Sequence, residues 1–132
     1  MASIFTKIIN REIPSFTIAE DDKHYAFLDI NPAARGHTLC IPKKEVDYLF
    51  DLSSDELSEL TRFSQKVAKG LDLALEPIRT GVIVEGMEVP HAHIHLIPIY
   101  TPTQNFSLGK KISMDDGEMA ELAETISKEI RL

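Results

Sequence analysis

The sequence predicts an α+β fold, with an antiparallel sheet of about five strands and two main helices on one face. Short apolar stretches of strand length follow one another, and they do not alternate with helices as a parallel doubly wound sheet requires. Two longer segments, residues 53–77 and 115–130, have the periodicity of amphipathic helices. A length of 132 residues suits one compact domain. We therefore expect a single domain over residues 1–132, with its core in 3–100 and a tail and helix in 101–132.

The expected strands are bounded by residues that favour turns. They cover residues 16–19, 25–29, 37–41, 80–84 and 89–98. Before them, residues 3–11 carry apolar side chains at helical spacing, which predicts a short helix lying on the sheet. At the start of the first main helix, Ser53 and Glu56 form a capping-box pattern, which favours a helix beginning at this point.

Composition and charge restrict the function. The chain has 14 Lys and Arg against 21 Asp and Glu, a formal net charge of −7, and nucleic-acid binding depends on clustered cations. No apolar run approaches the length of a membrane span, and the N-terminus lacks the features of a signal peptide. We therefore expect a cytoplasmic protein with neither nucleic acid nor membrane as a partner. Cys40 is the single cysteine, which excludes an internal disulfide and a zinc site built from cysteines.

The segment 89–98 carries the strongest functional signal. His91, His93 and His95 occupy alternate positions and are separated by apolar residues. Because successive side chains of a strand point to opposite faces, the three imidazoles would form a row on one side. Burying three imidazoles requires a partner for each polar nitrogen, which favours a functional site over a packed scaffold. Such a row suits either phosphoryl transfer or metal binding.

Phosphoryl transfer assigns a role to each histidine. A neutral imidazole has a lone pair that can attack phosphorus and form a phosphoramidate intermediate. His93 is in the middle of the row and is the candidate nucleophile. His95 is placed to hold the phosphate oxygens or the leaving group, while His91 and His37 would fix the tautomer and orientation of the other two. His24 lies beside acidic residues in a turn and is expected to belong to the scaffold.

Metal binding is the competing interpretation. Histidines two positions apart on a strand can both reach one zinc ion, and three with a water would make an open catalytic site. Along a standard strand, however, the first and third rings of the row are about 7 Å apart, roughly twice the separation of ligands in a tetrahedral site. A zinc site built on His91 and His93 with His37 remains as the alternative.

Several segments together resemble the histidine triad (HIT) superfamily. Residues 91–97 match its signature of alternating histidines and apolar residues, and three further stretches agree in the same order: residues 4–14 (IFTKIINREIP), 27–32 (FLDINP) and 36–44 (GHTLCIPKK). The resemblance covers residues 3–100. It implies a small α+β fold, a homodimer, and binding of a purine nucleotide or nucleotide conjugate whose α-phosphate meets the histidines.

The same resemblance implies roles for individual residues. His93, the central histidine, would be the nucleophile that forms a covalent nucleotidyl intermediate. Asp29 would accept hydrogen bonds from the ribose hydroxyls, for which a carboxylate is suited. The side chains that would enclose the base are Ile4, Phe5, Ile8, Phe27 and Ile30.

One loop departs from the family pattern. Where nucleotide-binding members usually carry a Gly-Gln-Ser or Gly-Gln-Thr group beside the phosphate, this chain has Gly86, Met87 and Glu88. Side-chain donors are lost there, although the backbone N–H groups of Glu88 and Val89 can still contribute. The N-terminal cysteines that bind zinc in some relatives are also absent, so we expect no structural metal and no cofactor.

The expected activity is hydrolysis at the α-phosphate of a purine nucleotide derivative, either a nucleoside phosphoramidate or an acyl-adenylate. Hydrolysis of diadenosine polyphosphates is the nearest alternative activity. Outside the enzymes, the alternative is a nucleotide sensor with little turnover, which agrees with the replacements at Met87 and Glu88.

Overall fold

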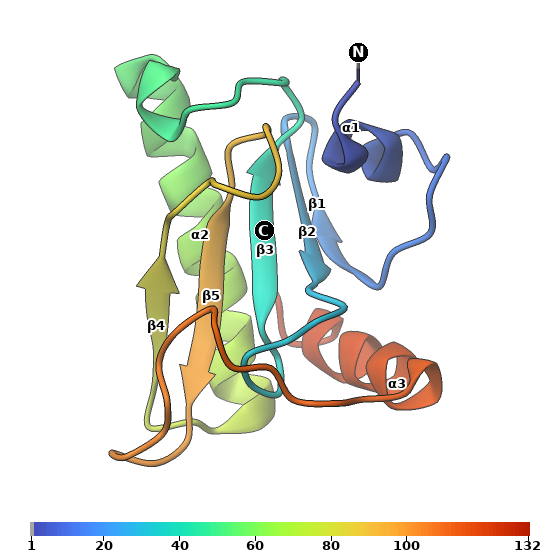
Figure 1. Cartoon of the computed structure of the whole chain (residues 1–132), viewed down its shortest axis with the longest axis vertical. Coiled ribbons are helices and arrows are strands. Elements are labelled where there is room, and N and C mark those ends of the chain that lie inside the picture. The colour runs from blue at the N-terminus through green and yellow to red at the C-terminus, as the bar shows by residue number, and fades with distance from the viewer. Residues whose placement is uncertain (1) are drawn as a thin grey trace.

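The computed structural model describes residues 2–132 and contains a five-stranded antiparallel sheet with three α-helices (Figure 1). The elements in chain order are α1 (Ile4–Ile9), β1 (Thr17–Glu20), β2 (His24–Leu28), β3 (Thr38–Pro42), the 3-10 turn η1 (Leu49–Asp51), α2 (Ser54–Leu75), β4 (Arg79–Ile83), β5 (Ile94–Ile99) and α3 (Asp116–Ser127). The strand order is β1-β2-β3-β5-β4, which places β1 and β4 at the two edges. The predicted α+β class and antiparallel sheet are confirmed.

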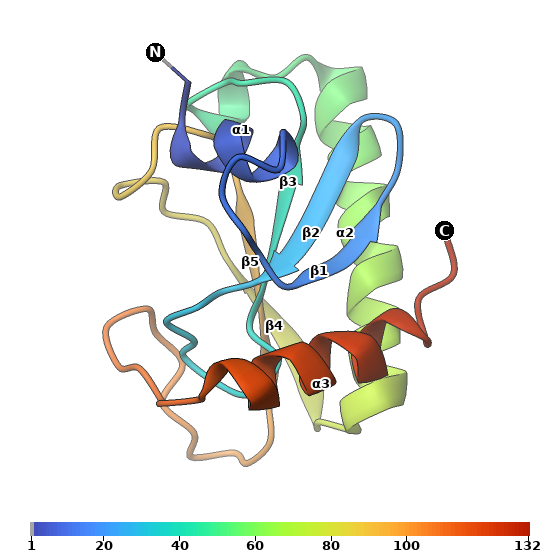
Figure 2. The same cartoon turned by 90° about the vertical axis from the view of Figure 1, so that its right-hand side faces the viewer.

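Helices cover both faces of the sheet (Figure 2). The two main helices, α2 and α3, pack on the face that carries Ala26 and Cys40. The opposite face carries Phe27, which packs against Phe5 and Ile8 of α1. The main helices therefore share one face, as predicted, but α1 extends the cover to the other face. The reason is that every residue of β2 and β3 is buried, so neither face of these central strands is exposed to water.

The predicted strand over 89–98 is shorter in the structure, because β5 begins only at Ile94. The N–H of His91 donates to the carbonyl of Val89 (2.8 Å), which turns the chain before the strand. The proline between them has no N–H to give to a sheet ladder. Of the three histidines only His95 lies within the strand, so the expectation of one strand that displays all three rings is wrong.

Both main helices begin where the sequence predicts. The Ser53 hydroxyl accepts a hydrogen bond from the N–H of Glu56, whose carboxylate accepts one from the Ser53 N–H (3.1 and 2.8 Å). Asp115 and Glu118 form the same capping box before α3. α2 ends at Leu75, and the next residue, Glu76, has a left-handed backbone (φ 50°). Within residues 2–132, no helix is both long enough and apolar enough to cross a membrane.

The tail between β5 and α3 crosses the sheet before the last helix begins (Figure 1, orange to red). The amide of Gln104 donates to a carbonyl of β5 (2.8 Å). The ring of Phe106 lies so close to Gly81 of β4 that a Cβ at this position would clash with it. The N–H of Ile112 donates to the carbonyl of Pro32 (2.8 Å). These contacts hold the tail against the sheet from β4 to the loop after β2.

Candidate active site

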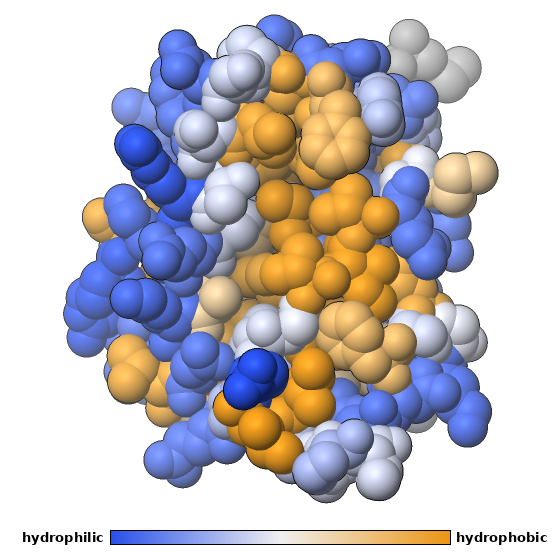
Figure 3. Space-filling view, turned by 90° about the vertical axis from the view of Figure 1, so that its left-hand side faces the viewer, coloured by the Kyte–Doolittle hydropathy of each residue, from blue (hydrophilic) through white to orange (hydrophobic). Residues whose placement is uncertain are grey.

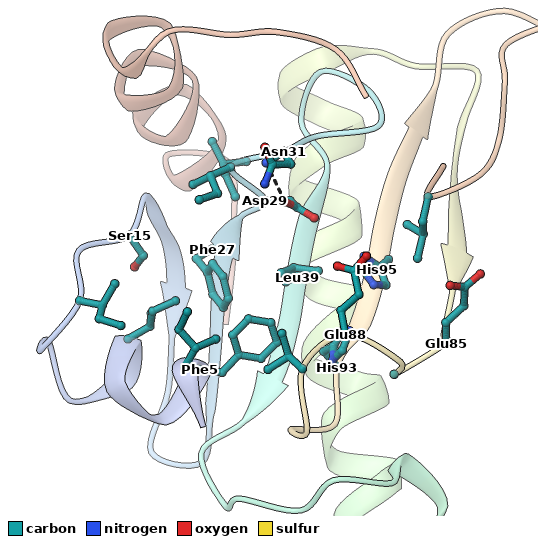
Figure 4. A pocket seen from close by; sticks show the side chains of 18 of the residues that line it. Phe5, Ser15, Phe27, Asp29, Asn31, Leu39, Glu85, Glu88, His93 and His95 are labelled. Atoms are coloured by element: carbon teal, nitrogen blue, oxygen red, sulfur yellow. Dashed lines mark hydrogen bonds between the residues drawn. The ribbon is translucent and has the colours of Figure 1, made fainter. Parts of the chain in front are cut away.

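A cavity of about 280 Å³ opens on the α1 face of the sheet. In Figure 4, the apolar side chains of Phe5 and Phe27 lie on one side of it, and Asp29 lies at the end of β2. His93 and His95 lie on the side of β5. An apolar half next to a polar half suits a ligand in which a ring system is joined to a charged group.

The backbone fixes the position of the hydrogen on His93. Its Nδ1 lies 2.7 Å from the carbonyl oxygen of His91. A carbonyl oxygen only accepts, so Nδ1 carries the hydrogen and donates it. In the neutral ring the lone pair is therefore on Nε2. The side chain of His93 lines the cavity. The ring of Phe5 meets His93 edge-on, with centroids 5.2 Å apart, and packs against it.

A chain of hydrogen bonds gives His95 the opposite tautomer. The N–H of Ala33 donates to Nδ1 of His37 (2.9 Å), which leaves the hydrogen of the neutral His37 ring on Nε2. This Nε2 lies 2.9 Å from Nδ1 of His95 and donates to it. His95 consequently keeps its own hydrogen on Nε2, beyond the reach of His37. The rings of His93 and His95 are neighbours, with centroids 4.9 Å apart. The lone pair on Nε2 of His93 and the N–H on Nε2 of His95 therefore belong to neighbouring rings.

His91 lies behind the cavity and anchors the segment. It is fully buried. Its Nε2 donates to the carbonyl of Pro42 (2.8 Å), so its Nδ1 accepts from the hydroxyl of Ser3 (2.8 Å). Both ring nitrogens are therefore bonded to protein groups. The contribution of His91 to the site is the carbonyl oxygen that orients His93.

Burial keeps the supporting imidazoles uncharged at neutral pH. Desolvation lowers the pKa of His37 to about 4. It lowers the pKa of His95 to about 3, and the neighbouring His93 and His37 add to this effect. Desolvation also lowers the pKa of His91. The contact of 3.6 Å between Nε2 of His37 and the carboxylate of Asp29 is therefore not an ion pair at neutral pH, because the imidazole is neutral.

Asp29 offers hydrogen-bond acceptors at the polar end of the cavity. Burial raises the pKa of its carboxyl, and a hydrogen bond from the N–H of Asn31 to Oδ1 (2.8 Å) works against that rise. The side chain is 16% exposed, so it faces the cavity and not bulk water. Its remaining lone pairs are open to the hydroxyl groups of a ligand.

The donor groups do not suit a metal ion. Asp29, His37 and His95 each place one potential ligand atom within 4.8 Å of the others. Nδ1 of His37, however, already accepts a backbone N–H. Binding a metal through Nε2 would therefore require removing the only ring hydrogen or breaking that backbone bond. The zinc site left open by the sequence needs His91, whose ring nitrogens are both bonded to protein groups.

Comparisons with known proteins agree with this geometry. Residues 10–101 match the sequence model of the HIT domain. The chain belongs to the HIT family. It is 35% identical to an uncharacterized HIT-like protein of Borreliella burgdorferi (96% of this chain, 97% of the relative). It is 32% identical to the adenosine 5′-monophosphoramidase of Schizosaccharomyces pombe (99% and 100%). The crystal structure of a HIT-like protein involved in cell-cycle regulation from Bartonella henselae has a TM-score of 0.85 at 34% identity (97% and 96%).

In this HIT protein the cavity brings together most of the residues that the sequence singled out. Two of the four predicted catalytic histidines and all of the predicted substrate-binding residues line it: His93, His95, Asp29, Ile30, Phe27, Ile4, Phe5, Ile8, Glu88 and Val89. His37 and His91 lie behind the lining and contact it through the hydrogen bonds described above.

Other cavity residues of the HIT protein were given no role by the sequence. They come from the segment after α1, from the end of β2 and the loop after it, from β3, from the loop after β4 and from the tail: Ile13, Pro14, Ser15, Leu28, Asn31, Leu39, Glu85, Leu108 and Lys111. Gly86 and Met87, which the sequence places in the loop beside the phosphate, line the cavity as well. Leu39 could have been found, because it shares its strand face with His37. Leu108 and Lys111 lie in an irregular segment with no periodicity, so only the folded chain places them.

Proposed function

We propose that this HIT protein is a nucleotide hydrolase that cleaves a bond at the α-phosphate of a purine nucleotide derivative, through a nucleotidyl intermediate on His93. The opposite tautomers of His93 and His95 carry this proposal. Attack on a phosphate requires an unprotonated nucleophile and a donor to the phosphate oxygens, and the two rings supply one each. The likeness to an adenosine 5′-monophosphoramidase supports a nucleoside phosphoramidate as substrate, with an acyl-adenylate as the related possibility.

The reaction would proceed in two displacements. Nε2 of His93 attacks the α-phosphorus, a P–N bond forms, and the bond to the leaving group breaks. The leaving group departs with the electron pair of that bond and takes up a proton from solvent. The N–H of His95 donates to the phosphate oxygens during attack. Water then attacks the phosphorus and gives up a proton to solvent, the electron pair of the P–N bond returns to Nε2 of His93, and the nucleoside monophosphate is released. His37 acts through His95 as a positioning residue.

The two halves of the cavity suit the two ends of a nucleoside. Phe5 and Phe27 are buried and offer flat apolar surface to a purine. Ile4 and Ile30 at the rim are 50% and 69% exposed, so a bound base would remove apolar surface from water. Asp29 would accept hydrogen bonds from the ribose hydroxyls.

The loop before the histidines has a limited role in this proposal. Glu88 lines the cavity but brings a negative charge and no side-chain donor. We infer that the backbone N–H groups of Glu88 and Val89 contribute to phosphate binding in place of the polar side chains that other HIT proteins carry here. Departure of the leaving group would then depend more on His95 than on side chains of this loop.

Turnover of adenosine 5′-phosphoramidate, followed as release of AMP and ammonia, tests the proposed function. We expect turnover by the native protein and loss of at least a thousandfold in His93→Ala, because the nucleophile is removed. Binding of AMP without turnover would favour the sensor. Faster cleavage of a diadenosine polyphosphate would favour the alternative activity, and loss of activity with a chelator would favour the zinc hydrolase.

We also propose that the protein is a homodimer that pairs through β4. β4 is an edge strand with an unbroken register against β5, whereas the other edge, β1, has an irregularity between Thr17 and Ala19. Val82 and Val84 are 59% and 42% exposed, and this side of the molecule carries an apolar band (Figure 3). A second copy pairing with β4 would cover this edge. The cytoplasmic location expected from the sequence stays a prediction.

A further inference from the structure

The tail between β5 and α3 forms part of the wall of the nucleotide cavity. Leu108 and Lys111 line the cavity together with Asp29, His93 and His95. The tail is held on both sides of these residues, by Phe106 packed on β4 and by the backbone bond of Ile112 to the loop after β2. Lys111 is the residue before Ile112, so its backbone is placed next to the loop after β2. The structure therefore fixes the base of a flexible, charged side chain at the cavity.

Lys111 changes the charge balance of a cavity that otherwise disfavours an anion. The other charged residues in the lining are Asp29, Glu85 and Glu88, all acidic. Among the described residues of the lining, Lys111 is the one lysine, and there is no arginine. A phosphate adds negative charge to three carboxylates, so this single ammonium matters more than it would on a mixed surface.

The ammonium of Lys111 is available to a ligand. Within residues 2–132, Lys111 forms no ion pair, whereas Lys43 and Lys44 are paired with Glu20 and Glu56 at 2.7 and 2.9 Å. Burial raises the pKa of Asp29, and the positive charge of Lys111 works against that rise. Burial lowers the pKa of His37 and of His95, and the charge of Lys111 adds to this effect. The charge of Lys111 thus reaches His95 at the proposed phosphate end of the cavity.

We propose that Lys111 is a specificity-determining residue that binds the α-phosphate oxygens of a 5′-nucleotide and makes the cavity prefer phosphorylated nucleosides over uncharged ones. The inference rests on the proposed nucleotide site and adds a residue outside the segments that resemble the family. Lys111 is exposed, so it approaches the phosphate from the solvent side while the N–H of His95 approaches from the sheet. An ammonium and an imidazole N–H would then contact different oxygens of one phosphate.

Calorimetric titration with AMP and with adenosine tests this role in the full-length protein. The variants are Lys111→Ala, Lys111→Arg and the matched control Lys110→Ala, which removes the neighbouring charge without changing the lining. We expect Lys111→Ala to weaken AMP binding about fivefold to tenfold and to leave adenosine binding unchanged. Lys111→Arg should restore most of the AMP affinity, and Lys110→Ala should behave as the native protein does. Raising the salt concentration should weaken AMP binding less in Lys111→Ala than in the native protein.

The outcomes separate this proposal from the one it rests on. Equal AMP affinity in the native protein and in Lys111→Ala would overturn the role of Lys111 and leave the nucleotide site standing. A parallel loss of AMP and adenosine affinity would overturn it as well, because Lys111 would then act on Asp29 and the ribose. A native protein that binds neither AMP nor adenosine would contradict both proposals.

Discussion

His91, His93 and His95 are identical side chains at alternate positions, yet His93 carries its hydrogen on Nδ1 and the other two carry theirs on Nε2. A carbonyl holds the hydrogen of His93 on Nδ1, a second carbonyl holds that of His91 on Nε2, and the N–H of His37 leaves that of His95 on Nε2. Backbone groups with one hydrogen-bonding role decide the tautomers of His91 and His93 directly, and that of His95 through His37, whose Nδ1 accepts the N–H of Ala33. The chemistry of the site therefore depends on backbone groups that no residue pattern displays.

His37 is predicted to act through His95. Leucine at position 37 cannot donate to Nδ1 of His95, so the hydrogen of His95 would no longer be confined to Nε2 and turnover should fall by about tenfold or more. Glutamine can place an N–H near the position of Nε2 and should recover part of the activity. Turnover of adenosine 5′-phosphoramidate by His37→Leu and His37→Gln measures this. NMR of the ring nitrogens of His95 reports the tautomer, which a purely structural role of His37 would leave unchanged once the variants are shown to be folded.

His24 is a histidine whose structural role the sequence predicts. His24 is buried, stacks on Phe63 with centroids 5.1 Å apart, and bonds to Asp21 at 3.0 Å. It was expected to belong to the scaffold because it stands alone beside acidic residues, and these contacts agree with that expectation. The sequence predicts that His91 orients the other rings, but not that it lies behind the cavity, because that position depends on a turn that a strand pattern does not show.

Local sequence patterns predict some helices and strands of this protein better than others. α2 begins at its capping box and is confirmed, since the signal lies within four neighbouring residues. β5 begins later than predicted, because alternation of apolar residues continues through a turn that the pattern cannot detect. α1 covers the second face of the sheet because the central strands are apolar on both sides. Local chemistry predicts where elements start better than it predicts which faces they cover.

The capping box of α2 gives a stability prediction for one element. Ser53→Ala removes the acceptor for the N–H of Glu56 and should lower the free energy of unfolding by about 1 kcal/mol. The matched control is Ser54→Ala, one residue later, where the side chain is exposed and makes no cap bond. Urea denaturation of both variants measures the difference. An equal effect of the two substitutions would contradict the role of the cap.

At the scale of the whole molecule, the cavity joins segments that are far apart in sequence. α1, the end of β2, the loop before β5 and the tail all contribute to it. The family resemblance placed the first three, because their motifs are recognisable in the chain. The tail has no such motif, and its contacts with Gly81 and Pro32 decide its course. The contribution of Lys111 therefore follows from the packing of the folded chain and from no pattern in the sequence.

If two copies pair through β4, a charge introduced on this edge strand should disrupt the dimer. Val82→Lys would place like charges near the two-fold axis of paired β4 strands and should convert a dimer to a monomer. The control is Leu73→Lys, because Leu73 is 65% exposed and shares the side of α2 with Arg62, Lys66 and Lys69 at helical spacing. Sedimentation velocity of the native protein and both variants measures the state. A native monomer, or a dimer unaffected by Val82→Lys, would contradict pairing through β4.

In the proposed mechanism, Nε2 of His93 attacks the α-phosphorus and holds the nucleotide covalently for part of the catalytic cycle. Intact-protein mass spectrometry after brief mixing with adenosine 5′-phosphoramidate measures this directly. We predict a transient gain in mass equal to an adenylyl group, which maps to His93 and is absent from His93→Ala. Consumption of the substrate at the native rate by His93→Ala, or an adduct that maps to another residue, would contradict it.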